Sequence, residues 1–300
     1  MISLRVATRG SKLSLIQVKL AMDYLSSRLG EPVSYTPVIV KTRGDVVQDR
    51  PLREIGVKGV FEKEVNKAVL EGAADVAVHS MKDLPGELSP ELDIVMVPPR
   101  DPPNDSLVFG KGRRPVASVY ELPPGSVVGT SSVRRAAFLR HYNSSIVVKP
   151  ARGNVDTRLG KLMSGEYDYL VLAEAGIRRL GLDPPRLVLP LDEVPPEPGQ
   201  GLIAVVARRD SEIAKLLGRA SDPLAAAMAR AERAFVRAVG AGCHVPVGGV
   251  SVPLGGGSLL FIAAVASESG DFMSIVRLRG SVEEPERLGV AAAEKIRELM

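Results

Sequence analysis

The sequence predicts an α/β protein with two similar doubly wound lobes, joined by a pair of hinge crossings, and a smaller C-terminal α/β domain. Short apolar strands alternate with helical stretches, which is the pattern of βαβ units and a parallel sheet. The same alternation starts again after the proline-rich segment 98–103, and a second proline cluster lies at 195–198. The length of 300 residues is enough for two or three domains.

The first lobe is expected at residues 1–98, completed by residues 200–219. Its predicted elements are, in order, a strand at 4–7, a helix at 12–29, a strand at 33–40, a helix at 60–70 and a strand at 75–78. An apolar strand at 202–206 is expected to belong to this lobe, because a second linker should bring the chain back from the second lobe to the first.

The second lobe is expected at residues 99–199. Its predicted elements are a strand at 126–129, a helix at 133–141, a strand at 146–148, a helix that ends near residue 163, a strand at 169–172 and a helix at 175–180. The two lobes therefore share one pattern of strands and helices.

The third domain is expected at residues 220–300 and carries the chain's one cysteine, Cys243. An alanine-rich helix begins after Asp222, which is a plausible cap with Pro223 in the first turn. It leads to a glycine-rich loop that holds Cys243 and stops at Pro246, so an exposed thiol is expected. A lone cysteine is more often a small packed hydrophobe than a reactive group, and the loop alone leaves both interpretations open. Strands near 250, at 259–265 and at 273–279 follow, and then a last helix at 285–300.

Composition and charge argue against several classes of protein. One cysteine excludes a disulfide framework within the chain, and the three histidines lie too far apart for metal-ligand spacing, so no metal is expected. A net charge of +4 and 4% aromatic residues without tryptophan argue against a nucleic-acid partner. No apolar run reaches membrane-spanning length and no signal segment precedes the first strand, so we expect a cytoplasmic protein without a membrane partner. Nothing indicates an obligate partner chain, so a monomer is expected.

Arginines recur where predicted strands turn into helices. These positions are Arg9, Arg134, Arg135, Arg152 and Arg158. Each junction exposes unpaired amides of a helix N-terminus, and a guanidinium matches the two oxygens of a carboxylate. Any one of these arginines is more often a solvated surface charge, but five at equivalent junctions favour a site for a ligand with several carboxylates. Asp83 is the carboxylate of this set that could stabilise a developing cation or accept hydrogen bonds from N–H groups.

Four ordered segments resemble the hydroxymethylbilane synthase family, also called the porphobilinogen deaminase family. They are HSMKDLP at 79–85, VGTSSVRR at 128–135, RGNVDTR at 152–158 and the cysteine loop at 239–249. Segments 42–45, 199–201 and 231–233 extend the match in the same order, so the resemblance covers nearly the whole chain. The family often has Gly-Gly-Lys-Gly where this chain has residues 56–59, and a second glycine where Ala241 stands. Both departures concern the conformation of loops.

The resemblance implies a transferase that condenses four porphobilinogen molecules head to tail, loses ammonia at each step and releases hydroxymethylbilane for tetrapyrrole biosynthesis. It implies a dipyrromethane cofactor bound to Cys243 through a thioether, and catalytic roles for Asp83, Lys82 and Arg9. The implied cofactor-binding residues are Cys243, Asp83, Lys82, Ser131, Ser132, Arg134, Arg135, Arg152 and Arg158. The implied substrate-binding residues are Arg9, Ser11, Arg152, Arg158, Arg179 and Gln200.

Two other classes of function remain open from the residues alone. Two α/β lobes with two chain crossings and arginines at the strand ends would also suit a periplasmic solute-binding protein for a carboxylate ligand. That alternative leaves the third domain and Cys243 without a use. A nucleic-acid binder would use the arginine clusters, but the small net charge argues against it.

Overall fold

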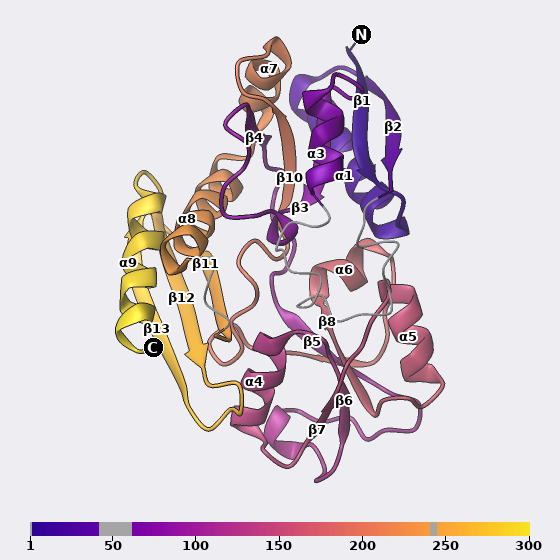
Figure 1. Ribbon diagram of the computed structural model, residues 1–300, viewed down its shortest axis with the longest axis vertical. Coiled ribbons are helices and arrows are strands. Elements are labelled where there is room, and N and C mark those ends of the chain that lie inside the picture. The colour runs from indigo at the N-terminus through magenta and orange to yellow at the C-terminus, as the bar shows by residue number, and fades with distance from the viewer. Residues whose placement is uncertain (1, 42–61, 241–244) are drawn as a thin grey trace. The chain divides into compact units, whose positions relative to one another are not determined.

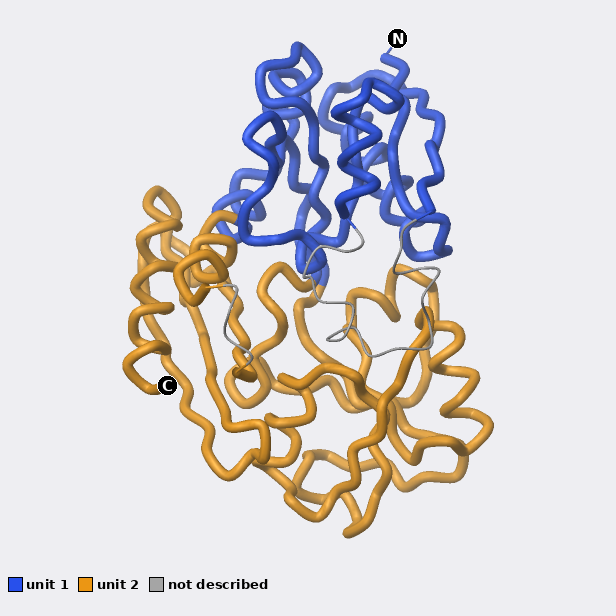
Figure 2. Tube along the Cα trace, viewed as in Figure 1, with its two compact units in different colours: residues 1–101, 201–229 blue, residues 102–200, 230–300 orange. Residues whose placement is uncertain are grey.

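The computed structural model describes residues 2–41, 62–240 and 245–300. The chain divides into two units, one of residues 1–101 with 201–229 and one of residues 102–200 with 230–300 (Figure 2). Three sheets are present in the described residues, two with five strands and one with three. The predicted α/β class, with two similar lobes and a smaller C-terminal domain, is confirmed. The domain boundaries drawn from the sequence stay a prediction.

The first unit is built on a five-stranded sheet with the order β2-β1-β3-β10-β4. Its elements are β1 (Ile2–Arg9), α1 (Lys12–Leu29), β2 (Val33–Val40), α3 (Lys63–Leu70), β3 (Val76–Ser80), β4 (Leu92–Met96), β10 (Ile203–Arg208) and α7 (Glu212–Ala220). Strand β1 pairs in parallel with β2 and β3, whereas β10 runs antiparallel to β3 and β4. The strand expected to return to this lobe does so as β10.

Helices α1 and α3 cover opposite faces of β3 (Figure 1). Val76 and Val78 pack with α1 in one hydrophobic cluster. The side chain of His79 points to the opposite face of the strand and forms a hydrogen bond with Asn66 of α3. Both faces of β3 are therefore buried, which explains why its first three residues, 76–78, are all apolar.

Helix α1 begins and ends where the predicted helix does, because both ends carry strong local signals. The Ser11 hydroxyl accepts a hydrogen bond from the Ser14 amide, and Gly30 takes a left-handed conformation with φ 70°. Between these caps, Val18, Ala21, Met22 and Leu25 are buried at helical spacing.

The second unit contains a sheet with the order β7-β6-β8-β5-β9. Its elements are β5 (Asp105–Phe109), β6 (Val127–Gly129), α4 (Val133–Tyr142), β7 (Val147–Lys149), α5 (Val155–Met163), β8 (Tyr169–Ala173), α6 (Glu174–Arg179) and β9 (Arg186–Val188). Strand β6 is parallel to β7 and β8, and β5 is antiparallel to β8 and β9. In each five-stranded sheet, the fourth strand in the order given above runs antiparallel to both of its neighbours. The sequence predicted a parallel sheet, so these two antiparallel strands were not expected.

The C-terminal residues form an antiparallel sheet of β11 (Val247–Gly255), β12 (Ser258–Ala266) and β13 (Met273–Ser281), with α8 (Pro223–Val239) and α9 (Pro285–Glu298) beside it. Asp222 caps α8 as predicted, because its side chain accepts a hydrogen bond from the Ala225 amide at 2.7 Å. Helices α8 and α9 approach closely at Gly289, where a Cβ atom would lie 2.0 Å from the Ala231 carbonyl oxygen.

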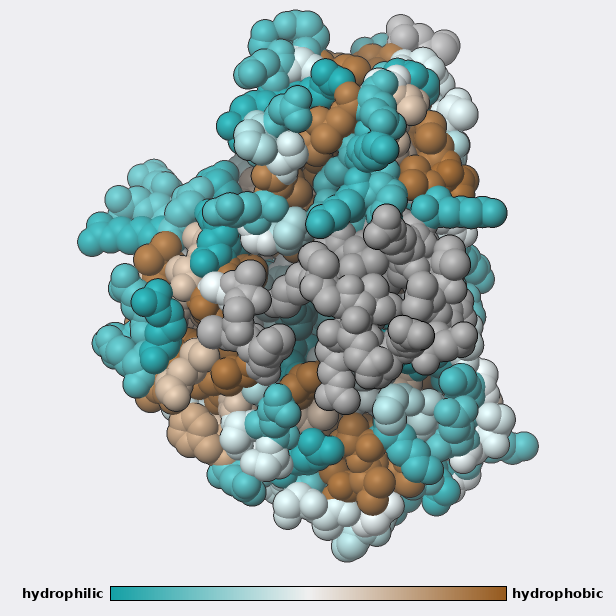
Figure 3. Space-filling model, in the orientation of Figure 1, coloured by the Kyte–Doolittle hydropathy of each residue, from teal (hydrophilic) through white to brown (hydrophobic). Residues whose placement is uncertain are grey.

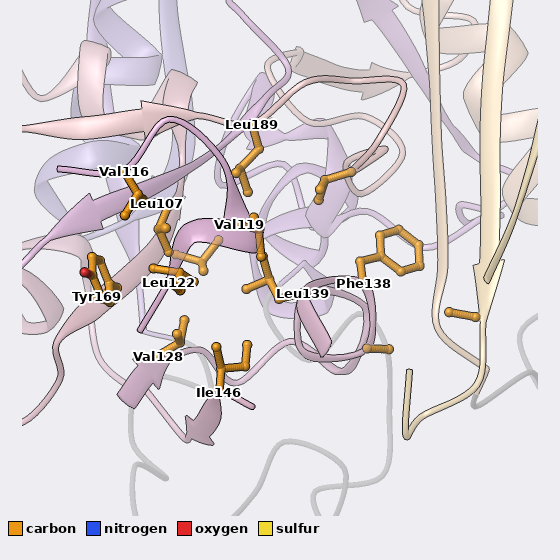
Figure 4. Close-up of a cluster of buried hydrophobic side chains, with 14 of the residues drawn as sticks. Leu107, Val116, Val119, Leu122, Val128, Phe138, Leu139, Ile146, Tyr169 and Leu189 are labelled. Atoms are coloured by element: carbon orange, nitrogen blue, oxygen red, sulfur yellow. The ribbon is translucent and has the colours of Figure 1, made fainter. Parts of the chain in front are cut away.

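This sheet shares a hydrophobic core with the second lobe (Figure 4). Ala264 and Ala266 of β12 belong to the same buried cluster as Phe138 and Leu139 of α4. Gly248 of β11 has no room for a side chain, since a Cβ atom would lie 2.3 Å from the Pro195 carbonyl oxygen. The segment before Gln200 is therefore held against the C-terminal sheet.

Among the coloured residues of Figure 3, hydrophilic ones cover most of the visible surface, and hydrophobic residues occupy smaller patches. Among the helices of the described residues, none is long and apolar enough to cross a membrane.

Candidate functional site

The carboxyl ends of β1 and β3 bring together the polar residues predicted in the first lobe. Arg9 is the last residue of β1, and Ser11 caps α1 two residues later. Strand β3 ends at Ser80 and continues into a short 3₁₀ turn, Met81–Asp83, which carries Lys82 and Asp83. Because carboxyl ends of neighbouring parallel strands meet at one edge of a sheet, Arg9 and Asp83 line the same pocket.

The pocket at this edge has a volume of about 20 Å³, which is enough for roughly one ordered water molecule. It is lined by Arg9, Ser14, Gln17, Glu62, Val78, His79, Ser80 and Asp83. Gln17 is 3% exposed, and its Nε2 donates to the Ser80 hydroxyl at 2.7 Å. The lining is mostly polar, so the pocket suits a small hydrogen-bonding group.

The second unit holds a buried ion cluster around Asp105, a residue that the sequence did not indicate. Asp105 is fully buried, and the two neighbouring guanidiniums of α4, Arg134 and Arg135, are 4% and 8% exposed. Arg134 Nη2 donates to Asp105 Oδ2 at 2.8 Å, and Arg135 Nη2 donates to Oδ1 at 2.6 Å. Burial acts to raise the pKa of the Asp105 carboxyl, but the two guanidiniums outweigh it and hold that pKa below its usual range.

The remaining bonds of this cluster fix the orientation of its members. Arg134 also donates to the Pro195 carbonyl at 2.9 Å, and Arg135 to the Val171 carbonyl at 3.3 Å. Gln200 is 1% exposed and donates from Nε2 to Asp105 at 2.8 Å. Arg134 Nε also lies 3.5 Å from a carboxylate oxygen of the partly exposed Glu197, so the two guanidiniums face one buried and one partly exposed carboxylate.

Arg158 of α5 adds a further cation near this cluster. Its Nε is buried and has no hydrogen-bond partner among the residues that the structure describes. Burial, and then the charge of Arg135, lowers the pKa of Arg158 to about 10. A buried donor without a partner is costly, so Arg158 is suited to an anionic ligand.

The other predicted residues of the second lobe lie at its helix ends. Ser132 caps α4, accepting from the Arg135 amide at 3.4 Å, and the Ser131 hydroxyl donates to the Ala151 carbonyl at 3.0 Å. Arg152 is half-buried just before α5, and Arg179 is half-buried at the last residue of α6.

Cys243, residues 42–45 and residues 56–59 lie outside the described residues. The structure thus gathers Arg9, Ser11, Lys82 and Asp83 in the first unit, and Arg134, Arg135 and Gln200 in the second. Within the described ranges, no group of three or more His, Cys, Asp and Glu side chains could hold a metal ion.

Two family models match the chain. One, described as "Porphobilinogen deaminase, dipyromethane cofactor binding domain", matches residues 4–215. The other, described as "Porphobilinogen deaminase, C-terminal domain", matches residues 226–298.

Curated relatives are similar over almost their whole length. A protein of Hyperthermus butylicus named "Probable porphobilinogen deaminase" is 51% identical over 297 residues, which cover 99% of this chain and 97% of the relative. A protein of Roseiflexus castenholzii named "Porphobilinogen deaminase" is 43% identical over 298 residues, covering 98% of this chain and 95% of the relative.

Among solved structures, substrate-binding domains are similar at a lower level. The second substrate-binding domain of Lactococcus lactis GlnP has a TM-score of 0.43 and 12% identity, covering 73% of this chain and 88% of that one. A substrate-binding domain of a putative amino acid transporter from Streptococcus pneumoniae has a TM-score of 0.44 and 13% identity, covering 73% and 91%.

Proposed function

Because the chain belongs to the porphobilinogen deaminase family, we propose that it joins four porphobilinogen molecules head to tail, releasing ammonia at each step and hydroxymethylbilane at the end. The product would enter the biosynthesis of haem, sirohaem or corrinoids. The observation that carries this proposal is the match of both family models, which together span nearly the whole chain. We further propose that the enzyme acts as a cytoplasmic monomer.

The family cofactor is dipyrromethane, and the residues of the second unit fit a ligand of this kind. Arg158 has a buried donor without a partner in the described part of the chain, and Asp105 holds the guanidiniums of Arg134 and Arg135 in fixed positions. Both features suit acetate and propionate groups. Bound dipyrromethane would supply the pyrrole ring to which porphobilinogen is added.

Asp105 gives Arg134 and Arg135 a role that the sequence did not indicate. Their guanidiniums are held in fixed positions by a buried carboxylate and by backbone carbonyls. Preorganised donors of this kind bind carboxylates without first losing side-chain freedom. We propose that Arg134, Arg135, Ser131 and Ser132 hold the cofactor, and that Arg152, Arg158, Arg179 and Gln200 contribute to binding the carboxylates of cofactor and substrate.

The first unit would carry the chemistry. We propose that the Asp83 carboxylate accepts hydrogen bonds from pyrrole N–H groups and stabilises the positive charge that develops as ammonia leaves. Arg9, Ser11 and Lys82 lie at the same edge of the first sheet as Asp83 and would bind substrate carboxylates. Cys243 would hold the cofactor through a thioether.

Ammonia release tests the proposed activity against its alternatives. Purified protein is incubated with porphobilinogen, and both ammonia and linear tetrapyrrole are measured over time. The proposal predicts one ammonia for each porphobilinogen consumed and four for each tetrapyrrole released. A solute-binding protein or a nucleic-acid binder would release none, and that result would overturn the proposed function.

A further inference from the structure

Tyr167 is a buried residue of the second unit to which the proposed function gives no role. It is 2% exposed and lies between α5 and β8, two residues before β8 begins. Its ring packs directly on the backbone at the end of β6, because a Cβ atom added to Gly129 would lie 2.9 Å from the ring carbon Cγ. Only a glycine at the end of β6 leaves room for the ring in this position.

The hydroxyl of Tyr167 reaches the end of the neighbouring strand. It donates to the Pro150 carbonyl oxygen at 2.9 Å, directly after the last residue of β7. Ala151, the next residue, is 5% exposed and belongs to the same buried hydrophobic cluster as Tyr167. Strands β6 and β7 are parallel neighbours, so one side chain contacts the carboxyl ends of both.

The two strand ends lead into the segments that carry several of the proposed ligand-binding residues. These are residues 130–132, between β6 and α4, and residues 150–154, between β7 and α5. The segments also bond to each other, since the Ser131 hydroxyl donates to the Ala151 carbonyl at 3.0 Å. Tyr167 adds a second link between them, from the buried side of the sheet.

We propose that Tyr167 is a positioning residue, which fixes the spacing between segments 130–132 and 150–154. With that spacing fixed, Ser131 and Arg152 are held ready for the same ligand. The inference rests on the proposed function and adds a residue that acts through the two segments. Binding groups that are fixed beforehand lose less freedom when a ligand arrives, so loosening one segment weakens binding more than it slows the chemistry.

The hydroxyl has one proton and two acceptors within reach. Glu166 Oε1 lies 2.8 Å from it, compared with 2.9 Å for the Pro150 carbonyl oxygen. Glu166 is exposed and also lies 3.7 Å from Lys161 Nζ. A bond to this carboxylate would orient Tyr167 alone, whereas the bond to Pro150 holds a segment of the site. The proposal therefore requires the bond to Pro150 and not the bond to Glu166.

Three substitutions separate these contributions. Tyr167→Phe removes the hydroxyl and keeps the ring. Glu166→Ala removes the other acceptor and leaves Pro150 as the partner of the hydroxyl. The matched control is Tyr169→Phe, because Tyr169 is 1% exposed in the hydrophobic cluster of Figure 4 and its hydroxyl donates to the Arg114 carbonyl at 3.3 Å, in a segment that carries none of the proposed site residues.

The assay is ammonia release at varied porphobilinogen concentration, on protein whose cofactor is confirmed by intact mass. We expect Tyr167→Phe to raise KM about 3- to 10-fold, which is the effect of losing one neutral hydrogen bond, while kcat stays within about twofold. Glu166→Ala and Tyr169→Phe should keep the wild-type KM. A wild-type KM in Tyr167→Phe, or an equal rise in either of the other two variants, would overturn the inference.

Hydrogen exchange gives a readout that does not depend on activity. Peptides that cover residues 150–154 should exchange about 3- to 10-fold faster in Tyr167→Phe and at the wild-type rate in Tyr169→Phe, and equal exchange in the two variants would contradict the inference. If the wild type releases no ammonia, the proposed function fails and the positioning role fails with it. An active wild type with an unchanged KM in Tyr167→Phe rejects the positioning role alone.

Discussion

Replacing Asp105 with asparagine tests how far the buried cluster stabilises the second unit. Asp105 accepts from Arg134 at 2.8 Å, from Arg135 at 2.6 and 3.1 Å, and from Gln200 at 2.8 Å, and it is fully buried. Asp105→Asn removes the charge and turns one acceptor into a donor that faces a guanidinium. These bonds share one carboxylate and do not add, so the cost is that of leaving a buried charge unpaired, about 3–5 kcal/mol of unfolding free energy.

Hydrogen exchange measured by mass spectrometry localises this loss. Peptides from β5 and β8 should exchange about 150- to 5,000-fold faster in Asp105→Asn, because each 1.36 kcal/mol is a factor of ten. Peptides from β1 and β3 of the other unit should change little. The control is Asp23→Asn, which removes an exposed pair with Lys19 at 2.5 Å and should leave exchange unchanged. If exchange in β5 and β8 of Asp105→Asn stays within twofold of the wild type, the cluster does not stabilise this unit.

The difference in unfolding free energy between the wild type and Asp105→Asn should change with pH in one direction only. The two guanidiniums hold the folded-state pKa of Asp105 below its usual range, so its contribution is fully present above the unfolded-state pKa of about 4. It is lost as the pH falls through the folded-state value. The stability difference between the wild type and Asp105→Asn should therefore shrink below about pH 4, and a difference that grows there would contradict this account.

Three further changes test other parts of the structure. Asp83→Asn keeps the size but removes the charge, so ammonia release should fall by about 100-fold or more with cofactor still attached, as intact mass and a coupled ammonia assay would show. Arg158→Leu removes a cation whose pKa is lowered to about 10 by burial, so its thermal midpoint should equal or exceed that of the wild type while addition of porphobilinogen slows. Burial acts to raise the pKa of Glu174, but bonds from Arg186, Arg178 and Ser106 lower it to about 2, so Glu174→Gln should cost stability above pH 4 and progressively less as the pH falls toward 2, measured by urea unfolding.

Elements with local signals at both ends were predictable from the sequence. Helix α1 matches its predicted bounds because Ser11 and Gly30 cap it, and β2 matches its bounds of 33–40. Strands β4, β5 and β9 and helix α7 were not predicted. A fully buried strand such as β5 shows no alternation of apolar and polar residues, and its direction depends on where the chain enters the sheet.

The candidate site was predictable where it depends on strand ends and not where it depends on distant partners. Arg9 ends β1 and Asp83 follows β3, and the two strands are parallel neighbours, so their shared pocket follows from the order of the strands. Asp105 and Arg135 are 30 residues apart in the sequence, and their hydrogen bond forms only in the folded unit. His79 lay in a segment noted for its resemblance, but its bond to Asn66 depends on how α3 packs on β3, and no local pattern reports this packing.

The intact mass of the protein tests the central claim most directly. Wild-type protein purified from cells that make porphobilinogen should exceed the mass of the bare chain by one dipyrromethane unit. The same preparation of Cys243→Ser should show the bare mass and release no ammonia from porphobilinogen. A wild-type protein that has the bare mass and is nevertheless fully active would contradict the account.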